Sequence, residues 1–214
     1  MFINILSERQ RSLLESLNNF NIIKKFYLAG GTAVALYLGH RYSDDFDLFS
    51  PYEFHHEEII HSLKQIGNLD ITGTARGTLH CLVNEIKLSF LYYDYPLKEP
   101  LNEALGISIA GLTDIGLMKI TAIASRGSKK DFIDLYFIAR KHRSLEDLFT
   151  LLPNKFEGVN YSMYHLIKSL SFFEDAENEP DPIMIEYFSW EEVKSYFRKK
   201  EKVLFEIFFL NEPK

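Results

Sequence analysis

Two aspartates one residue apart, Asp45 and Asp47, are the residues of this chain whose types and spacing best suit chemistry. They lie in an otherwise apolar run over residues 45–49, which predicts a β-strand. Because a strand alternates its faces, the two carboxylates point the same way, and their mutual repulsion favours a cation between them. Mg²⁺ suits such a pair, since it takes few protein carboxylates and completes its octahedron with water and phosphate oxygens.

A pair of glycines followed by a threonine, Gly30-Gly31-Thr32, precedes the aspartates. Residues 25–29 predict a buried strand and residues 32–38 a helix, so the glycines form the turn between them. Glycine lets the backbone approach a ligand closely, and the first N–H groups of a helix bind anions. Thr32 is expected to cap the helix and to help hold a triphosphate. A glycine pair is often only a turn, but beside metal-binding carboxylates it indicates nucleotidyl transfer.

A second charged group, Lys119, Arg126 and Asp131, lies in the second half of the chain. Lys119 and Arg126 share roughly one face of a predicted helix, where they would hold the triphosphate and neutralise charge as pyrophosphate leaves. Asp131 is also the third residue after Ser128, a spacing typical of a capping box, so a purely structural role stays open. Asp134 shares the helix face of Asp131 and is the weaker candidate.

The elements that must position these residues divide into strands in the first half of the chain and helices in the second. This order predicts an α+β fold: a mixed sheet with flanking helices that carries the site on one face, followed by a helical region packed on it. We expect a sheet domain over residues 1–111 and a helical region over 112–214. The predicted strands are 25–29, 45–49, 69–74, 78–83, 86–93 and 105–110, and the later helices are 113–125, 128–141, 144–153, 159–172 and 189–209.

The composition excludes several classes of protein. The net charge of −6 argues against a generic nucleic-acid binder, which needs a broad basic surface, although a local basic patch is compatible with it. Cys81 is the single cysteine, so no intramolecular disulfide can form, as fits a reducing cytoplasm. With no signal peptide and no apolar stretch of membrane-spanning length, we expect a cytoplasmic protein without a membrane partner.

The two groups of residues resemble a known family. Gly30-Gly31-Thr32 followed by Ser43-Asp-Asp-Phe-Asp47 is similar to the nucleotidyltransferase superfamily that includes DNA polymerase beta, and more narrowly to the AbiEii/AbiGii toxin family. In that family a G-G-T-A helix leads to an S-x-D-h-D-h strand, where h is apolar. Its later motif, a lysine, then an arginine, then Lys-Asp-x-x-Asp-Leu, is matched by residues 119–135. The resemblance implies that Lys119 and Asp131 are catalytic and that Ser43 and Arg126 belong to the nucleotide site.

The resemblance also implies an activity. Such an enzyme transfers a nucleotidyl group from an NTP to an acceptor hydroxyl and releases pyrophosphate, with Mg²⁺ or Mn²⁺ as cofactor. The resemblance further implies that the protein is a toxin of a toxin–antitoxin system, acting on tRNA or on a protein side chain. It also implies a cognate antitoxin as partner.

One position departs from the wider superfamily. Polymerase-like members place a third carboxylate on a later strand, which residues 86–93 match, and there Lys87, Ser89 and Leu91 are expected to face the site. Ser89 stands where the acid is expected, and a serine cannot take a proton as a carboxylate does. We therefore expect Asp131 to supply the base. Two alternatives stay open, a binding protein of the same fold without turnover and a small-molecule nucleotidyltransferase such as an antibiotic-modifying enzyme.

Two further patterns have ordinary interpretations. The histidines beyond His40, including His55, His56 and His61, show no metal-ligand spacing and are interpreted as surface residues. The acidic run over residues 173–182 is interpreted as a solvated loop between helices.

Overall fold

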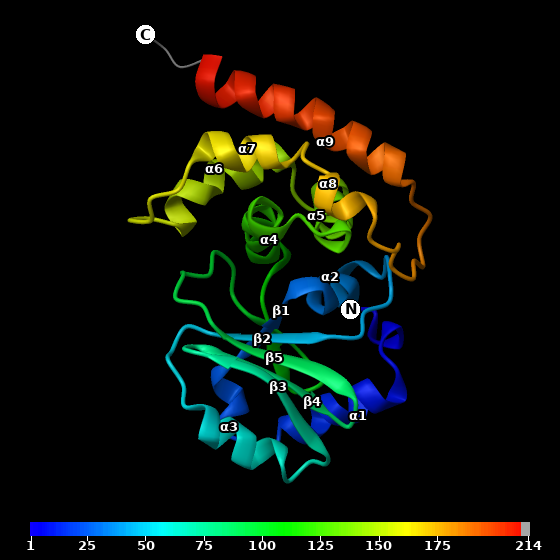
Figure 1. The fold of residues 1–214 in the computed structure, drawn as a ribbon, viewed down its shortest axis with the longest axis vertical. Coiled ribbons are helices and arrows are strands. Elements are labelled where there is room, and N and C mark those ends of the chain that lie inside the picture. Colours follow the sequence, from blue (N-terminus) through cyan, green and yellow to red (C-terminus); the bar gives the residue numbers. More distant parts are fainter. Residues whose placement is uncertain (211–214) are drawn as a thin grey trace. The chain divides into compact units, whose positions relative to one another are not determined.

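The computed structural model describes residues 1–210, which fall into two compact units, Met1–Gly111 and the residues from Leu112 onward (Figure 1). The first unit contains the strands and the second is helical, so the predicted α+β class with a mixed sheet is confirmed. No helix within the described residues has the length and apolar character needed to cross a membrane.

Among the described residues, the first unit is built on a seven-stranded mixed sheet with the strand order β3-β4-β5-β2-β1-β7-β6. The β2–β5 and β1–β7 pairs are parallel and the other pairs are antiparallel. The strands are β1 (Tyr27–Ala29), β2 (Phe46–Ser50), β3 (Leu69–Ala75), β4 (Thr78–Val83), β5 (Ile86–Tyr92), β6 (Asn102–Ala104) and β7 (Ile107–Ile109). The single strand expected over residues 105–110 is instead the turn and second strand of the β6–β7 hairpin, because Leu105 and Gly106 adopt positive φ.

Helices cover both faces of this sheet. Figure 1 shows α1 (Glu8–Leu17) and α3 (His56–Leu63) on one side and α2 (Gly30–Leu38) on the other. The α1 helix begins with a capping box of Ser7 and Gln10, whose three-residue spacing is visible in the sequence. Phe46, Leu48 and Phe90 on the inner strands are fully buried, which makes their face the core face of the sheet. Two short 3₁₀ turns, Ile3–Ile5 and Ile23–Lys25, complete the unit.

The second unit packs its helices around aromatic rings. Phe132 lies at its centre, with ring centroids of Phe173, Trp190 and Phe197 at 5.0, 5.9 and 5.4 Å. Pro153 does not end its helix as the sequence suggests, because it is accommodated in the last turn. The elements are α4 (Leu112–Arg126), α5 (Lys129–Lys141), α6 (Leu145–Lys155), α7 (Met163–Ser169), α8 (Glu174–Glu177), α9 (Trp190–Phe205) and a π-helical turn (Glu206–Leu210).

Candidate active site

Asp45 and Asp47 lie on the non-core face at the start of β2. The strand alternates as its sequence predicts, with Phe46 and Leu48 buried in the core and Asp47 half-buried on the opposite face. Asp45 directly precedes the strand, and its side chain is 44% exposed. The Nζ atom of Lys87 on β5 lies 3.7 Å from its Oδ2 atom. The two carboxylates therefore share one side of the sheet and stay accessible to a ligand.

The backbone of Gly30 lies against the carboxylate of Asp47. A Cβ atom on Gly30 would lie 2.5 Å from Oδ2 of Asp47, and the φ of +68° is one that other residues rarely adopt. The α2 helix begins at Gly30, and no side chain within the described residues caps its start. Thr32 is thus not the N-cap that the sequence suggested, because the helix starts two residues earlier and Ala29 takes that position. The start of this helix therefore lies beside Asp47.

Thr32 and Ser43 act together on the loop that enters β2. Their hydroxyl oxygens are 2.7 Å apart, and the Thr32 hydroxyl also donates to the carbonyl of Asp45. Gln10 donates from Nε2 to the carbonyl of Ser43 at 2.8 Å. Thr32 and Ser43 are both buried. In this arrangement the two hydroxyls hold the backbone that carries Asp45.

A row of polar residues continues from Asp47 across two further strands. Ser89 on β5 is the register partner of Asp47, and His80 on β4 is the register partner of Ser89. The Nδ1 atom of His80 lies 3.1 Å from the hydroxyl of Ser89. Sequence reasoning missed His80, which it grouped with the surface histidines. Its place between buried Leu79 and Cys81 in an alternating strand was the available signal.

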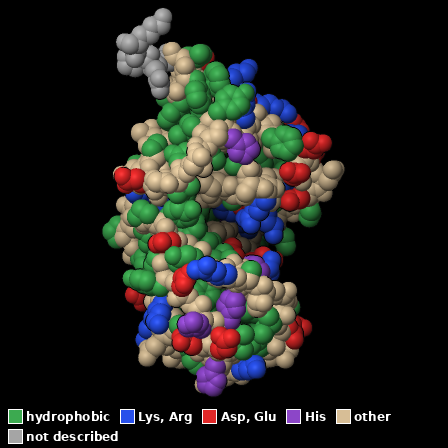
Figure 2. Space-filling view, turned by 60° about the vertical axis from the view of Figure 1, so that its left-hand side comes forward, with side chains coloured by type: hydrophobic (Ala, Val, Ile, Leu, Met, Phe, Trp, Pro, Cys, Tyr) green, Lys and Arg blue, Asp and Glu red, His purple; other side chains and the backbone are tan. Residues whose placement is uncertain are grey.

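Two of the other histidines lie at the surface, as expected from the sequence. His55 and His61 are exposed, and Figure 2 shows histidine side chains at the surface of the first unit.

In the second unit, Lys119 joins two aspartates in a buried cluster. Its Nζ atom on α4 lies 2.8 Å from Oδ1 of Asp131 and 2.7 Å from Oδ2 of Asp134, both on α5. The side chains of Lys119, Asp131 and Asp134 are 6%, 1% and 0% exposed. Asp131 and Asp134 are close to one helical turn apart, so both face Lys119. The structure thus brings together the lysine and aspartates of the later motif.

Asp131 is also held by Arg126, the last residue of α4, and by Ser128, which precedes α5. Arg126 approaches its carboxylate with Nε at 2.7 Å and with a terminal nitrogen at 3.1 Å, and the Ser128 hydroxyl donates to it at 2.8 Å. Burial alone would raise the pKa of Asp131, but Lys119 and Arg126 outweigh burial and lower it to about 2. The predicted capping box is wrong here, because the side chain of Ser128 accepts no backbone hydrogen bond at the helix start.

The acidic run is mostly exposed, as expected, but it is not a simple loop, because it includes α8 and supports the start of α5. The backbone N–H of Lys129 donates to the carboxylate of Glu179 at 2.8 Å, and its Nζ atom lies 3.1 Å from Asp181. The same ammonium lies 5.4 Å from the ring centroid of Trp190. Carboxylates at a helix N-terminus are stabilising. Glu179 therefore supplies the side-chain acceptor at the start of α5 that Ser128 does not supply.

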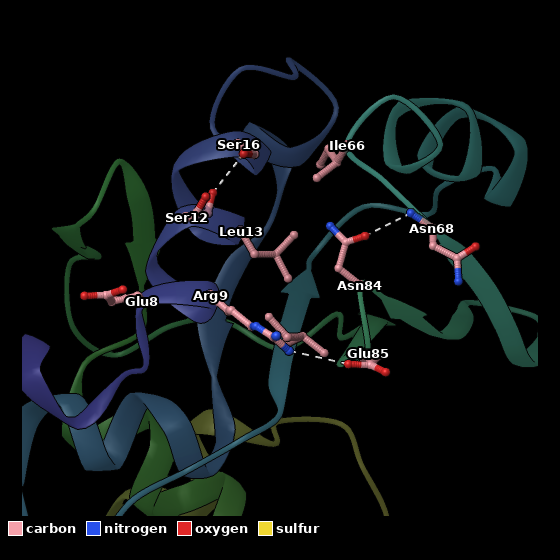
Figure 3. Close-up of a pocket in the computed structure, with 10 residues that line it drawn as sticks. Glu8, Arg9, Ser12, Leu13, Ser16, Ile66, Asn68, Asn84 and Glu85 are labelled. Atoms are coloured by element: carbon pink, nitrogen blue, oxygen red, sulfur yellow. Dashed lines mark hydrogen bonds and ion pairs between the residues drawn. The ribbon is translucent and has the colours of Figure 1, made fainter.

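Each unit has a pocket, and Asp45 and Asp47 line neither of these two pockets. In the first unit a pocket of about 720 Å³ lies between α1 and the β4–β5 turn, where Arg9 and Glu85 form an exposed ion pair of 3.5 Å (Figure 3). In the second unit a pocket of about 370 Å³ is lined by Arg126, His165, Lys168 and Phe172. The candidate site is instead defined by its residues, the two carboxylates beside the start of α2.

Comparison with known families decides the class of the protein. The model of the family described as "Nucleotidyl transferase AbiEii toxin, Type IV TA system" matches residues 12–189, which include both motifs. The chain belongs to the AbiEii nucleotidyltransferase family. The prediction that it is an enzyme of nucleotidyl transfer is confirmed at the level of the family.

Three relatives illustrate the match. The uncharacterized protein aq_aa25 of Aquifex aeolicus (strain VF5) is 43% identical over 92% of this chain and 96% of its own length. MenT4 (Rv2826c), a nucleotidyltransferase toxin of Mycobacterium tuberculosis, is 15% identical with a TM-score of 0.59, over 92% of this chain and 81% of MenT4. JHP933 of Helicobacter pylori is 16% identical with a TM-score of 0.51, over 94% of each chain. At these identities the two structures show the shared fold.

Nucleotidyltransferases of this family generally use an NTP and a divalent cation. The accessible carboxylates on one face of the first unit fit such a cation, and the adjoining helix start fits the phosphates that the cation would accompany. Within residues 1–210 no group of three or more His, Cys, Asp or Glu residues is arranged to hold a metal. The cation would therefore take its remaining oxygens from water and the triphosphate, which is how Mg²⁺ is usually held in phosphoryl-transfer sites.

Proposed function

We propose that this protein is a metal-dependent toxin that transfers a nucleotidyl group from an NTP to a hydroxyl at the end of an RNA, with tRNA as the preferred acceptor. The contact between Gly30 and the carboxylate of Asp47 carries this proposal. It joins the accessible acidic pair to a helix start without a side-chain cap, so a cation and the phosphates that it neutralises would meet at one point.

The roles in the first unit follow from this arrangement. Asp45 and Asp47 would hold Mg²⁺ or Mn²⁺, which supplies charge neutralisation at the phosphates. The N–H groups of Gly30, Gly31 and Thr32 would bind the triphosphate, while Ser43 fixes the loop that carries Asp45. The acceptor oxygen attacks the α-phosphorus, the bond to the β-phosphate oxygen breaks, and pyrophosphate leaves.

In the second unit we assign Asp131 a positioning role in place of the expected general base. Its oxygens accept hydrogen bonds from Lys119, Arg126 and Ser128, and a carboxylate with a pKa of about 2 is a weak proton acceptor. It holds the two cations of the motif in place. The side chain of Arg126 is 65% exposed, so its guanidinium is accessible to an anionic group.

An RNA acceptor is compatible with the acidic chain if the contact is local. The pocket beside Arg126 combines the cationic Lys168 with His165 and the exposed ring of Phe172, which suits an unpaired nucleotide. We extend the proposal to a cognate antitoxin and to action in the cytoplasm, because the family description names a toxin–antitoxin system.

The direct test offers NTPs with a radioactive α-phosphate to the purified chain, together with total tRNA and Mg²⁺, Mn²⁺ or a chelator. We expect label on RNA from at least one NTP, dependent on the metal, and lost when the terminal hydroxyls are destroyed by periodate. Label on protein instead of RNA would overturn the RNA acceptor and show that a protein hydroxyl accepts the nucleotidyl group. No label on RNA or on the proteins of a lysate would overturn the proposed function.

A further inference from the structure

Transfer to a hydroxyl leaves one proton without an evident acceptor. The attacking oxygen must lose its proton as it bonds to phosphorus, and a base placed within hydrogen-bond reach usually takes it. Asp45 and Asp47 would be committed to the cation, and Asp131 is committed to Lys119 and Arg126. At the expected position of a third acid on β5 stands Ser89.

Ser89 is within hydrogen-bond distance of the imidazole of His80, a residue to which the proposed function gives no role. Asp47, Ser89 and His80 occupy one row across β2, β5 and β4, and neighbouring strands in a sheet lie about 4.8 Å apart. Leu79 and Cys81 on either side of His80 are fully buried, so strand alternation directs the imidazole to the face of Asp47. Ser89 is 4% exposed, and its hydroxyl lies 3.1 Å from Nδ1 of His80.

We propose that Ser89 and His80 form a proton relay that replaces the missing third carboxylate. The proton of the acceptor hydroxyl moves to the Ser89 oxygen as the Ser89 proton moves to Nδ1 of His80. The new oxygen–phosphorus bond forms as the bond to pyrophosphate breaks, so charge and protons balance. The relay requires the neutral tautomer of His80 with its proton on Nε2. The inference rests on the proposed function.

The surroundings of the relay are charged but not crowded. Lys87 on β5 and the carboxylates of Asp45 and Asp47 on β2 occupy the same face, and Asp70 on β3 lies one row away beside Leu82. The position opposite His80 on β3 is Gly73, where an added Cβ would be 3.7 Å from the ring. The half-buried imidazole can therefore return its proton to solvent after each turnover.

The decisive variant is His80→Asn, measured in the tRNA-labelling assay. Its side-chain oxygen still accepts a hydrogen bond from Ser89, which preserves a structural role, but it cannot take a proton at neutral pH. We expect kcat to fall about a hundredfold, with KM for the NTP and the melting temperature nearly unchanged. His61→Asn, a change of the same kind at an exposed histidine on α3, should leave kcat unchanged.

A second variant restores the acid in place of the relay. Ser89→Asp puts a carboxylate at the expected position, so the double variant Ser89→Asp/His80→Asn should recover most of the lost kcat. A full rate in His80→Asn, or a loss that Ser89→Asp does not relieve, would overturn the relay. If His80→Asn does not fold, His80→Gln replaces it with the same expectation. Absence of transfer by the unaltered chain would instead overturn the proposed function, and the relay with it.

Discussion

The two units each carry a pair of aspartates, and the two pairs differ in burial and in their cationic partners. Asp45 and Asp47 stand half-exposed at the start of a strand, with the ammonium of Lys87 3.7 Å from the carboxylate of Asp45. Asp131 and Asp134 are buried, and both lie within 3 Å of the same lysine. The first pair is suited to bind a ligand, whereas the second is suited to hold the protein's own cations in position.

The difference has an energetic consequence. Exposed carboxylates keep most of their hydration, so their charge costs the fold little and their neutralisation by a metal stays favourable. Buried carboxylates have lost their hydration and depend on the lysine and arginine that replace it. Changes in the first pair should therefore alter activity, and changes in the second should alter stability.

The largest effect is expected at the accessible pair. Asp47→Asn keeps the volume of the side chain but removes charge from the metal site, so transfer should fall at least about a thousandfold, or several kcal/mol of transition-state stabilisation. The melting temperature without metal should stay the same or rise, because repulsion from Asp45 is removed. Initial rates of tRNA labelling and thermal unfolding measure the two quantities.

Asp44→Asn is the matched control, because Asp44 is an exposed neighbour outside the strand. It should leave the rate within about twofold of the unaltered chain. Near-normal transfer by Asp47→Asn would remove the metal assignment.

The next effect is expected at the buried lysine. Lys119→Met keeps an apolar stem of similar size but leaves Asp131 and Asp134 without their shared ammonium. Breaking a buried ion pair in this way typically costs about 3–5 kcal/mol of folding free energy. Denaturant unfolding of the whole chain measures the loss.

A second substitution tests whether charge causes that loss. Lys119→Met/Asp134→Asn removes one of the two stranded carboxylates, so it should recover a substantial part of the lost stability. A double variant no more stable than Lys119→Met would mean that Lys119 acts through packing and not through its charge.

Much of the fold and of the first aspartate pair could be predicted from local patterns. The alternation of Phe46, Asp47 and Leu48 determines which face each side chain takes once the strand forms. The capping box at Ser7 likewise depends only on residues three apart. Short-range sequence rules describe such features because the interacting groups belong to one element.

What the sequence could not show depends on partners distant in the chain. His80 is linked to Ser89 only through the pairing of two strands, and Lys129 meets Glu179 fifty residues later. At Ser128 the local pattern of a capping box was present, but Asp131 is used by Lys119 and Arg126 instead. The roles of the individual site residues stay predictions until the variants are measured.

A smaller effect should appear as the pH is lowered. The pKa of Asp131 is lowered to about 2 in the folded protein, below the value of about 4 usual for an unfolded aspartate. The folded state therefore binds fewer protons than the unfolded state, so this group contributes stability above pH 4 and loses it as the pH falls towards 2. The contribution is on the order of 2 kcal/mol.

Denaturant unfolding at a series of pH values tests this expectation against Asp131→Asn, which cannot titrate at that position. The difference in unfolding free energy between the two proteins should narrow as the pH falls from about 4 to 2. A difference that stays constant over this range would show that Asp131 has an ordinary pKa in the folded protein.

The smallest effect concerns the cation beside the accessible pair. Lys87 and Asp45 are each about half exposed, and a pair of this kind typically contributes about 0.2–1 kcal/mol. Lys87→Ala should change stability within that range, but it also removes a positive charge that competes with a metal ion for Asp45. Mn²⁺ should therefore bind up to about fivefold more tightly in calorimetric titration, and the gain should shrink as salt screens the charge. Unchanged or weaker binding would show that the cation does not use Asp45, while Asp47 and Gly30 would still define the site.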